Sequence, residues 1–403
     1  MKITKLSLAV ITAVTMTTGA MAEADMKLGG QAVLYYQTIE SGGDTDFFDQ
    51  GNSRANAGLQ LNLNSDLGND FGLGVQGTFL GTLGLENNLV SNTMQTAKEG
   101  DLNSEALTKL YLTKKVANTT LKLGRQELPK SLSPLAFSEG WNVFKNTFDA
   151  AVAINTDIPD TTVVGAYVSK SNGDINGKRV GLVDLGSFDN MAGSVGNKAV
   201  GTLNSGAYML TVANKSSKIV QPTVSYYALK DIMGKESGNA LWADVKVNTS
   251  LPVGLSLQGG TIMPENDLDD TTAYGVKVTG KAQMVDLSLA YTSVDDGTVG
   301  IKNVGTGVKT PLYTQMVFNQ NHINSDNDTV VLGASSAVGP GKLIAKYDLT
   351  TDNSAASNDY NELDVIYKFK ALGTNMLAAY VRADADNASD PQNIIRFWTR
   401  YNF

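Results

Sequence analysis

The chain has no cysteine, only nine prolines and a single histidine among its 403 residues. Without cysteine it has neither disulfide bonds nor thiolate metal sites, so its stability must come from hydrogen-bonded structure. Beyond the first 22 residues no apolar run approaches the roughly 18 residues of a membrane-spanning helix. Glycine, in contrast, is abundant at 40 residues, against a usual share of about 7%. A glycine-rich, proline-poor chain is typical of repeated strands and turns.

The first residues have the pattern of a secretory signal peptide. Lys2 and Lys5 form a basic start, residues 6–14 form an apolar core, and small residues precede a cleavage site between Ala22 and Glu23. We therefore predict a signal peptide over residues 1–22 and a single exported domain over residues 23–403.

The predicted mature chain is acidic. Removal of residues 1–22 leaves 30 basic and 40 acidic side chains, a formal charge of −10. Nucleic acid is excluded as a partner, because phosphate binding needs clustered lysine and arginine.

Apolar and polar residues alternate with a period of two over segments of about ten residues. In the last segment, residues 393–403, Ile395, Phe397, Tyr401 and Phe403 share one face, and Arg396 and Arg400 share the other. A soluble β-sandwich also alternates. Ten residues is, however, the length of a tilted strand that crosses a bilayer, whereas soluble strands average about five or six. Aromatic residues at the segment ends also suit the interfacial girdles of a membrane barrel.

We therefore predict an all-β fold, a transmembrane antiparallel β-barrel of about 18 strands, with 16 as the alternative. Short connections, such as residues 67–70 and 372–375, are predicted on the periplasmic side. Long connections, residues 294–327 among them, are predicted on the outside.

A barrel this wide holds water, so its function must be carried by residues that face the lumen. The inward positions of the predicted strands hold a set of basic residues, which would form an electropositive wall attractive to anions: Arg54, Lys122, Lys246, Lys277, Lys342, Lys346, Lys368, Arg382, Arg396 and Arg400. Acidic residues occupy inward positions too, so the alternative is ordinary solvated charges that pair across strands.

The connection over residues 128–146 is unusually apolar for an exposed loop. Because such a loop must bury its apolar side chains, we predict that it folds into the barrel and constricts the pore. An external lid packed on other loops or on a second subunit is the alternative. The predicted constriction comprises the loop residues Lys130, Glu139, Trp141 and Lys145 and the flanking residues Arg125, Glu127 and Asp149.

The segments LGRQELPK (residues 123–130) and FSEGWNVFKNTFDA (residues 137–150) resemble the Opr family of outer-membrane porins, in particular the campylobacter-type major outer membrane porins. This resemblance is sharpest over residues 119–170. It implies an eighteen-stranded, trimeric, water-filled channel whose third loop, here Pro129 to Lys145, folds inward. It implies no particular substrate.

Tyr401 and Phe403 at the C-terminus resemble the signal by which barrel-assembly machinery recognises its clients. The expected partners are outer-membrane lipid and lipopolysaccharide, this machinery, two further copies of the chain, and small hydrophilic solutes and ions. The sequence thus predicts a porin of the outer membrane, with an adhesin or closed binding barrel as the alternative.

An enzyme is not expected. The lone histidine, His322, is predicted to be solvated in an external loop, and no G-x-S-x-G nucleophile motif lies near it. We predict no cofactor and no catalytic residues. We also predict no metal site, because the acidic loop segments lack EF-hand spacing.

Overall fold

The computed structural model describes residues 25–43, 45–97, 102–172, 183–184, 191–195, 198–203, 205–232, 236–248, 252–265 and 268–403. The predicted signal peptide lies outside these residues.

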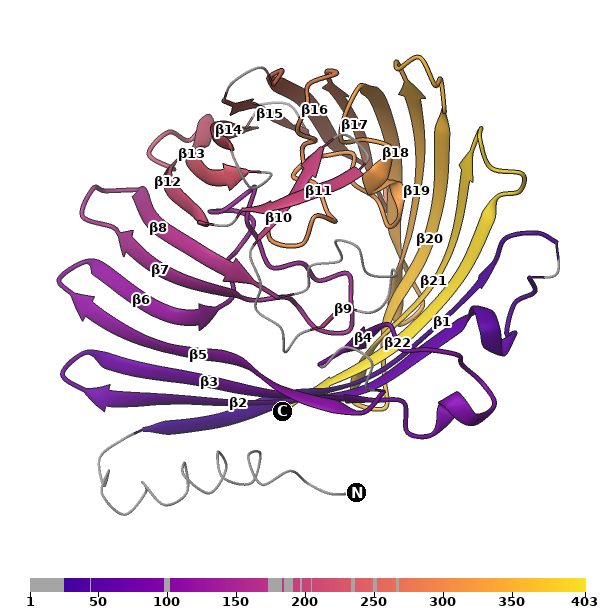
Figure 1. Ribbon diagram of the computed structural model, residues 1–403, viewed down its shortest axis with the longest axis horizontal. Helices are drawn as coiled ribbons and strands as arrows, with labels where there is room; N and C mark the ends of the chain where they lie inside the picture. The colour runs from indigo at the N-terminus through magenta and orange to yellow at the C-terminus, as the bar shows by residue number, and fades with distance from the viewer. Residues whose placement is uncertain are drawn as a thin grey trace.

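Eighteen antiparallel strands form one closed sheet (Figure 1). The strands are β1 (Met26–Glu40), β2 (Ser53–Gly68), β3 (Phe71–Gly81), β5 (Ser104–Val116), β6 (Thr119–Gln126), β7 (Phe148–Asn155), β8 (Thr161–Ser171), β12 (Ala207–Asn214), β13 (Val220–Ile232), β14 (Glu236–Asn248), β15 (Val253–Pro264), β16 (Thr271–Ala282), β17 (Val285–Val294), β18 (Asn327–Val338), β19 (Gly341–Asp352), β20 (Tyr360–Ala371), β21 (Thr374–Ala385) and β22 (Gln392–Asn402). Each pairs with its neighbours along the chain, and β22 pairs with β1 to close the barrel. The predicted barrel is confirmed, with 18 strands rather than 16.

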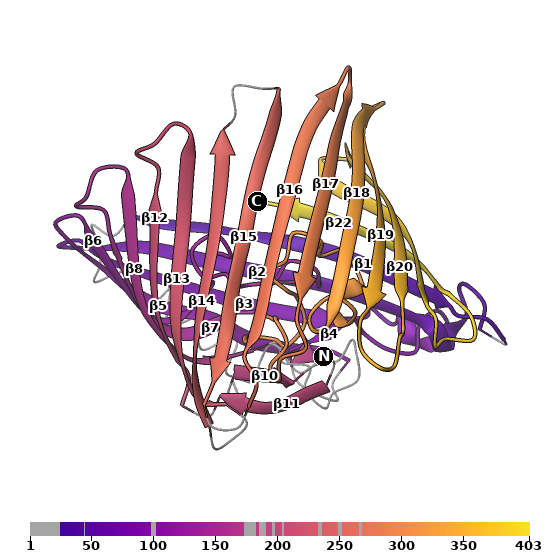
Figure 2. The ribbon, with the colours of Figure 1, turned by 90° about the horizontal axis from the view of Figure 1, so that it is seen from above.

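The remaining elements lie in the connections. Strand β4 (Gln95–Thr96) pairs in parallel with β9 (Val183–Asp184), and β10 (Met191–Val195) pairs with β11 (Lys198–Leu203) at the long-loop end of the barrel (Figure 2). The described residues include three single-turn 3-10 helices: η2 (Gln50–Asn52), η3 (Leu85–Asn87) and η4 (Asn319–Asn321). Within the described ranges, no helix has both the length and the apolar character needed to cross a membrane.

The period-two alternation separates an apolar outer wall from a polar inner wall. On β1, Leu28 and Leu34 point outward and are 82% and 52% exposed, whereas Gln37 on the other face is buried. Strand register carries this division around the barrel, because Gln37 lies opposite both Arg54 of β2 and Arg396 of β22. The two walls are therefore chemically distinct, as a bilayer-spanning barrel with an aqueous interior requires.

The connections differ between the two ends of the barrel. At one end, tight turns join the strands, and Leu372 and Gly373 both take positive φ values, 52° and 74°. Two successive residues with positive φ form a type I′ turn, whose twist matches that of the two strands it joins. The long loops, as far as the structure describes them, lie at the other end, so we call the two ends the short-turn end and the long-loop end.

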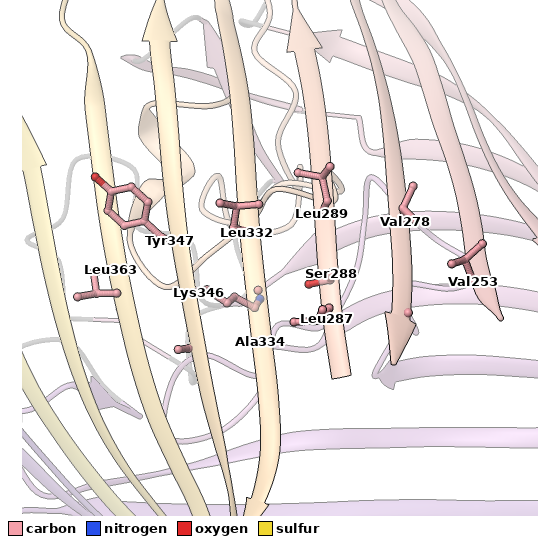
Figure 3. A pocket seen from close by; sticks show the side chains of 13 residues that line it. Val253, Val278, Leu287, Ser288, Leu289, Leu332, Ala334, Lys346, Tyr347 and Leu363 are labelled. Carbon is pink, nitrogen blue, oxygen red and sulfur yellow. The ribbon is translucent and has the colours of Figure 1, made fainter. Parts of the chain in front are cut away.

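A shallow apolar groove of about 630 Å³ lies on the outer wall, across β15 to β20 (Figure 3). Large outward side chains such as Leu289, Leu332 and Tyr347 line it, and small residues such as Ala334 and Ala345 hollow it. Its large apolar side chains lie on the outward face, so this groove is not part of any path through the barrel.

Candidate functional site

The loop between β6 and β7, residues 127–147, crosses the interior of the barrel; we call it the third loop. At one side the backbone N–H of Leu135 donates to the hydroxyl of Tyr227 on β13 (3.2 Å). At the other side Arg400 Nη2 on β22 donates to the carbonyl of Val143 (2.8 Å). The loop therefore contacts two distant parts of the inner wall, and the predicted inward fold is confirmed.

Apolar side chains hold the third loop inside. Leu128, Leu135, Phe137, Val143 and Phe144 are all buried. Phe144 packs where Gly58 of β2 has no side chain; a Cβ there would lie 2.6 Å from the Phe144 ring. Burial of a large apolar side chain contributes about 1.5–3 kcal/mol, which is why so apolar a loop does not remain in solvent.

A second long loop, residues 295–326 between β17 and β18, also lies inside the barrel; we call it the seventh loop. The hydroxyl of Tyr313 donates to Asp244 Oδ1 on β14 (2.8 Å). The backbone N–H groups of Val317 and Phe318 donate to Glu362 Oε1 on β20 (2.8 and 2.9 Å). The orange segment within the ring of strands in Figure 1 belongs to this loop.

Residues 294–327 were predicted on the outer side of the barrel, and their folding into it was not predicted. Apolar residues recur along the seventh loop, and most of them are buried: Val299, Ile301, Val308, Leu312, Met316 and Ile323. The same criterion that identified the third loop identifies this one, but here the apolar residues are spaced among polar ones, so the signal is weaker.

Part of the predicted constriction comes together on the wall formed by β5 and β6. Glu127 accepts from Lys109 Nζ (2.5 Å) and from Lys145 Nζ (3.2 Å). Lys122 lies beside this group, 3.8 Å from the centre of the Tyr111 ring. Burial opposes the ionisation of Glu127, but the two lysines outweigh it and hold its pKa below the usual value. The result is a cluster of three lysines around one glutamate beside the third loop.

Lys109 was missed by the sequence analysis because the strand is irregular there. The pairing of β3 with β5 shifts by one residue between Gln76 and Gly77, so that Thr108 is an extra residue in β5. A β-bulge of this kind breaks strict alternation. Only the register reveals which face Lys109 occupies.

Two predicted constriction residues do not face the lumen. Arg125 and Asp149 are paired (Nε to Oδ1, 3.1 Å), and the register places them opposite each other, out of phase with the inward-facing Lys122 and Val152. They lie on the outward face, which also carries Leu123. Their assignment to the constriction was therefore wrong, and the pair joins β6 to β7 instead.

The other predicted constriction residues lie in the third loop. Lys130 Nζ donates to the carbonyl of Thr310 in the seventh loop (3.0 Å) and lies 5.1 Å from the Phe137 ring centre. The indole N–H of Trp141 donates to Glu139, which is only 4% exposed.

The predicted basic wall is placed inward except at Arg382. Arg382 pairs in register with Asn393 and Leu363 on the outward face and binds Asp384 (2.9 Å). Its predicted position in the lumen was wrong. Leu377 faces inward on β21, and Arg382, an odd number of residues away, lies on the opposite face. The register faces the others inward: Arg54, Lys122, Lys246, Lys277, Lys342, Lys346, Lys368, Arg396 and Arg400.

These inward basic residues do not form one uniform wall. Around β22, Arg396 donates to Gln37 Oε1 through Nε and Nη2 (3.1 and 2.8 Å). Around β19 and β20, bases alternate with acids, since Lys346 lies opposite Asp364 in the register. Lys342 likewise binds Asp286 (3.1 Å). The inward charges therefore comprise a sector rich in arginine around β22 and a sector of mixed charges around β19 and β20.

His322 is not the solvated loop residue that was predicted. It stacks on Tyr360 of β20, with ring centres 4.0 Å apart and an interplanar angle of 8°. Among the residues that the structure describes, no three histidine, cysteine, aspartate or glutamate side chains are grouped to hold a metal ion.

Tyr401 and Phe403, the predicted assembly signal, project from the outer wall at the short-turn end. They are 49% and 53% exposed, and their ring centres lie 6.0 Å apart. An exposed aromatic pair at the edge of the apolar band is what an interfacial girdle needs.

The fold is that of outer-membrane porins. The structure is similar to OpdK of Pseudomonas aeruginosa, solved with vanillate (TM-score 0.75, 13% identity, 94% of this chain and 98% of that chain), and to OccAB3 of Acinetobacter baumannii (TM-score 0.74, 15% identity, 94% and 99%). OccK8 (OprE) of Pseudomonas aeruginosa is also similar (TM-score 0.71, 14% identity, 94% and 98%). No protein-family model and no curated protein sequence matches the chain. At these identities the likeness establishes the architecture, an 18-stranded Occ/Opr-type barrel.

Proposed function

We propose that the chain is an outer-membrane porin of the Opr type, a water-filled channel for passive diffusion of ions and small hydrophilic solutes. The single observation that carries this proposal is that charged side chains inside a closed barrel are half exposed. In a closed barrel, an inward side chain is exposed only where water fills the interior.

These exposed charges occur at two levels of the barrel. At the constriction, the side chain of Lys145 is 53% exposed although Phe144 and Asn146 on either side of it are buried. Towards the short-turn end, Lys342 and Asp286 are 49% and 53% exposed. Exposed charges at both levels support a continuous aqueous path past the two loops.

Conductance of the purified protein in a planar bilayer tests the proposal. A porin gives discrete, ohmic current steps in salt, because its path is permanently hydrated. An adhesin or closed binding barrel gives none, and the absence of steps from correctly folded protein would overturn the proposal.

The narrower expectations are also part of this proposal. The resemblance of residues 123–150 supports a campylobacter-type porin and a homotrimer. The apolar outer wall supports contact with outer-membrane lipid and lipopolysaccharide, and the terminal Phe403 supports recognition by barrel-assembly machinery. A cleaved signal peptide over residues 1–22 accounts for export. Cross-linking of the protein in isolated outer membranes, followed by mass measurement, tests both the location and the trimer.

A further inference from the structure

The third and seventh loops meet at one buried carboxylate, that of Glu139. Its Oε1 accepts from three groups of the seventh loop: Asn303 Nδ2 (2.6 Å), the backbone N–H of Lys309 (3.1 Å) and the hydroxyl of Thr306. Its other oxygen accepts from Trp141 in the third loop. Glu139 is 4% exposed and Asn303 is fully buried, so water does not compete for these bonds.

Further bonds join the same two segments. Asn303 Oδ1 accepts from the backbone N–H of Phe137 (3.0 Å), and Asn303 Nδ2 donates back to the Phe137 carbonyl (2.8 Å). The backbone N–H of Val304 donates to the carbonyl of Leu135 (2.8 Å). More than 160 residues separate the partners of the Asn303 bonds, so the contact is entirely tertiary.

We propose that Glu139 is the positioning residue that clamps the third and seventh loops into one rigid unit, and that this unit fixes the aperture of the channel. The reason is that three hydrogen-bond donors of the seventh loop share one acceptor, the Oε1 of Glu139. Without the Glu139 oxygens, the donors on Asn303, Thr306 and Lys309 lose a shared acceptor in a buried site, where unsatisfied polar groups are costly. The two loops would then be joined only by the bonds of Asn303 and Val304 to the third-loop backbone and by the bond from Lys130 to Thr310. The inference rests on the proposed channel function.

Two substitutions of Glu139 separate its hydrogen bonding from its charge. Glu139→Ala removes every acceptor. Glu139→Gln keeps one carbonyl oxygen, which can accept the three bonds from the seventh loop, and gives up only the bond from Trp141. A matched control is Ser133→Ala, which removes the buried bond from Ser133 Oγ to the Ala136 carbonyl (2.6 Å) and an interaction with Tyr227 of the wall, but no bond to the seventh loop.

Hydrogen–deuterium exchange of residues 303–309 gives a readout that does not depend on conduction. We expect exchange roughly tenfold faster or more in Glu139→Ala, because three buried donors then lose their acceptor. Wild-type protection is expected in Glu139→Gln and in Ser133→Ala. In bilayers, Glu139→Ala is expected to show added sub-conductance levels and current noise, whereas Glu139→Gln is expected to remain quiet.

Unchanged exchange and unchanged current in Glu139→Ala would overturn the clamp, as would a Glu139→Gln protein as loose as the alanine variant. Altered mobility of unheated protein on gels verifies that each variant has a folded barrel. Should the alanine variant fail to assemble, Thr306→Val is compared instead; it retains the shape but removes the donor to Glu139 and the acceptor of the Val308 N–H. Protection of residues 303–309 equal to wild type in that variant would also overturn the clamp. A failure of the channel function itself would appear in the wild type, which would then give no current.

Discussion

Gly30 and Phe403 exchange two backbone hydrogen bonds across the seam of the barrel. The N–H of Gly30 donates to the carbonyl of Phe403 (2.8 Å), and the N–H of Phe403 donates to the carbonyl of Gly30 (3.1 Å). A Cβ at Gly30 would lie 2.2 Å from the Gln60 carbonyl oxygen and 2.7 Å from the Phe403 ring. The seam between β1 and β22 therefore has no room for a side chain at this position.

The first prediction concerns this seam. Gly30→Ala is expected to lower the free energy of unfolding by about 1–3 kcal/mol, the usual cost of an overpacked site. Urea unfolding in lipid bilayers, followed by tryptophan fluorescence, measures it. Gly165→Ala is the control, because a Cβ at Gly165 meets nothing within 4 Å. Equal stability of the two variants would show that the seam tolerates a side chain.

The second prediction concerns the outer wall. Leu332→Arg places a charge on the membrane-facing side of β18 and is expected to cost about 2–4 kcal/mol if the site lies near the bilayer midplane. Ser335→Arg, on the inward face of the same strand, is expected to cost far less because it remains in water. The same unfolding assay compares them. A larger cost for Ser335→Arg would mean that the two faces are reversed.

The third prediction separates inward from outward charges. Lys145→Gln removes a half-exposed charge at the constriction, so the reversal potential in a KCl gradient should move toward cation preference. Arg382→Gln removes a charge on the outer face and should leave the reversal potential unchanged. A shift of the reversal potential in Arg382→Gln would show that Arg382 faces the lumen after all.

The fourth prediction concerns pH. Burial lowers the pKa of Lys302 and of Lys309, both in the seventh loop, to about 8. As the pH rises through about 8, both lose their positive charge, so anion permeability relative to cation permeability should fall. Reversal potentials at about pH 6 and about pH 9.5 measure this change. In the double variant Lys302→Met/Lys309→Met the response should be smaller, and an identical response would assign the titration to other groups.

The same two groups affect stability with a definite sign. Their pKa lies near 8 in the folded chain and at 10.5 without burial. Between these values the unfolded chain binds more protons, so their contribution to the free energy of unfolding rises with pH across that window.

Much of this architecture was predictable, because apolar and polar residues alternate along a strand whose two faces meet different surroundings. The last segment illustrates the point, since Phe397 and Arg396 were assigned to opposite faces and the structure has them so. The inward third loop was predictable for a similar reason, because its apolar residues need a buried surface. Both inferences depend on local composition alone.

The errors arose where tertiary contacts decide which face a residue occupies or which groups it bonds. Arg125 and Arg382 lie close to strand ends, where the outward face of a barrel accepts charge, so residue type did not reveal their direction. The bulge at Thr108 shifted the phase of β5 and concealed Lys109. The role of Glu139 depends on Asn303, Thr306 and Lys309, which are remote in sequence, and no local pattern links them.

The pairing of β1 with β22 has a consequence for how the barrel is completed. Every other strand of the barrel sheet pairs with neighbours along the chain, whereas Gln31 and Arg400, 369 positions apart, are joined by a side-chain bond across the seam. Loop closure over such a distance is slow, and a sheet without β22 leaves two unpaired edges that favour aggregation. The chain must therefore be kept from associating with other copies until its last strand has docked, so kinetics as well as stability limit its yield.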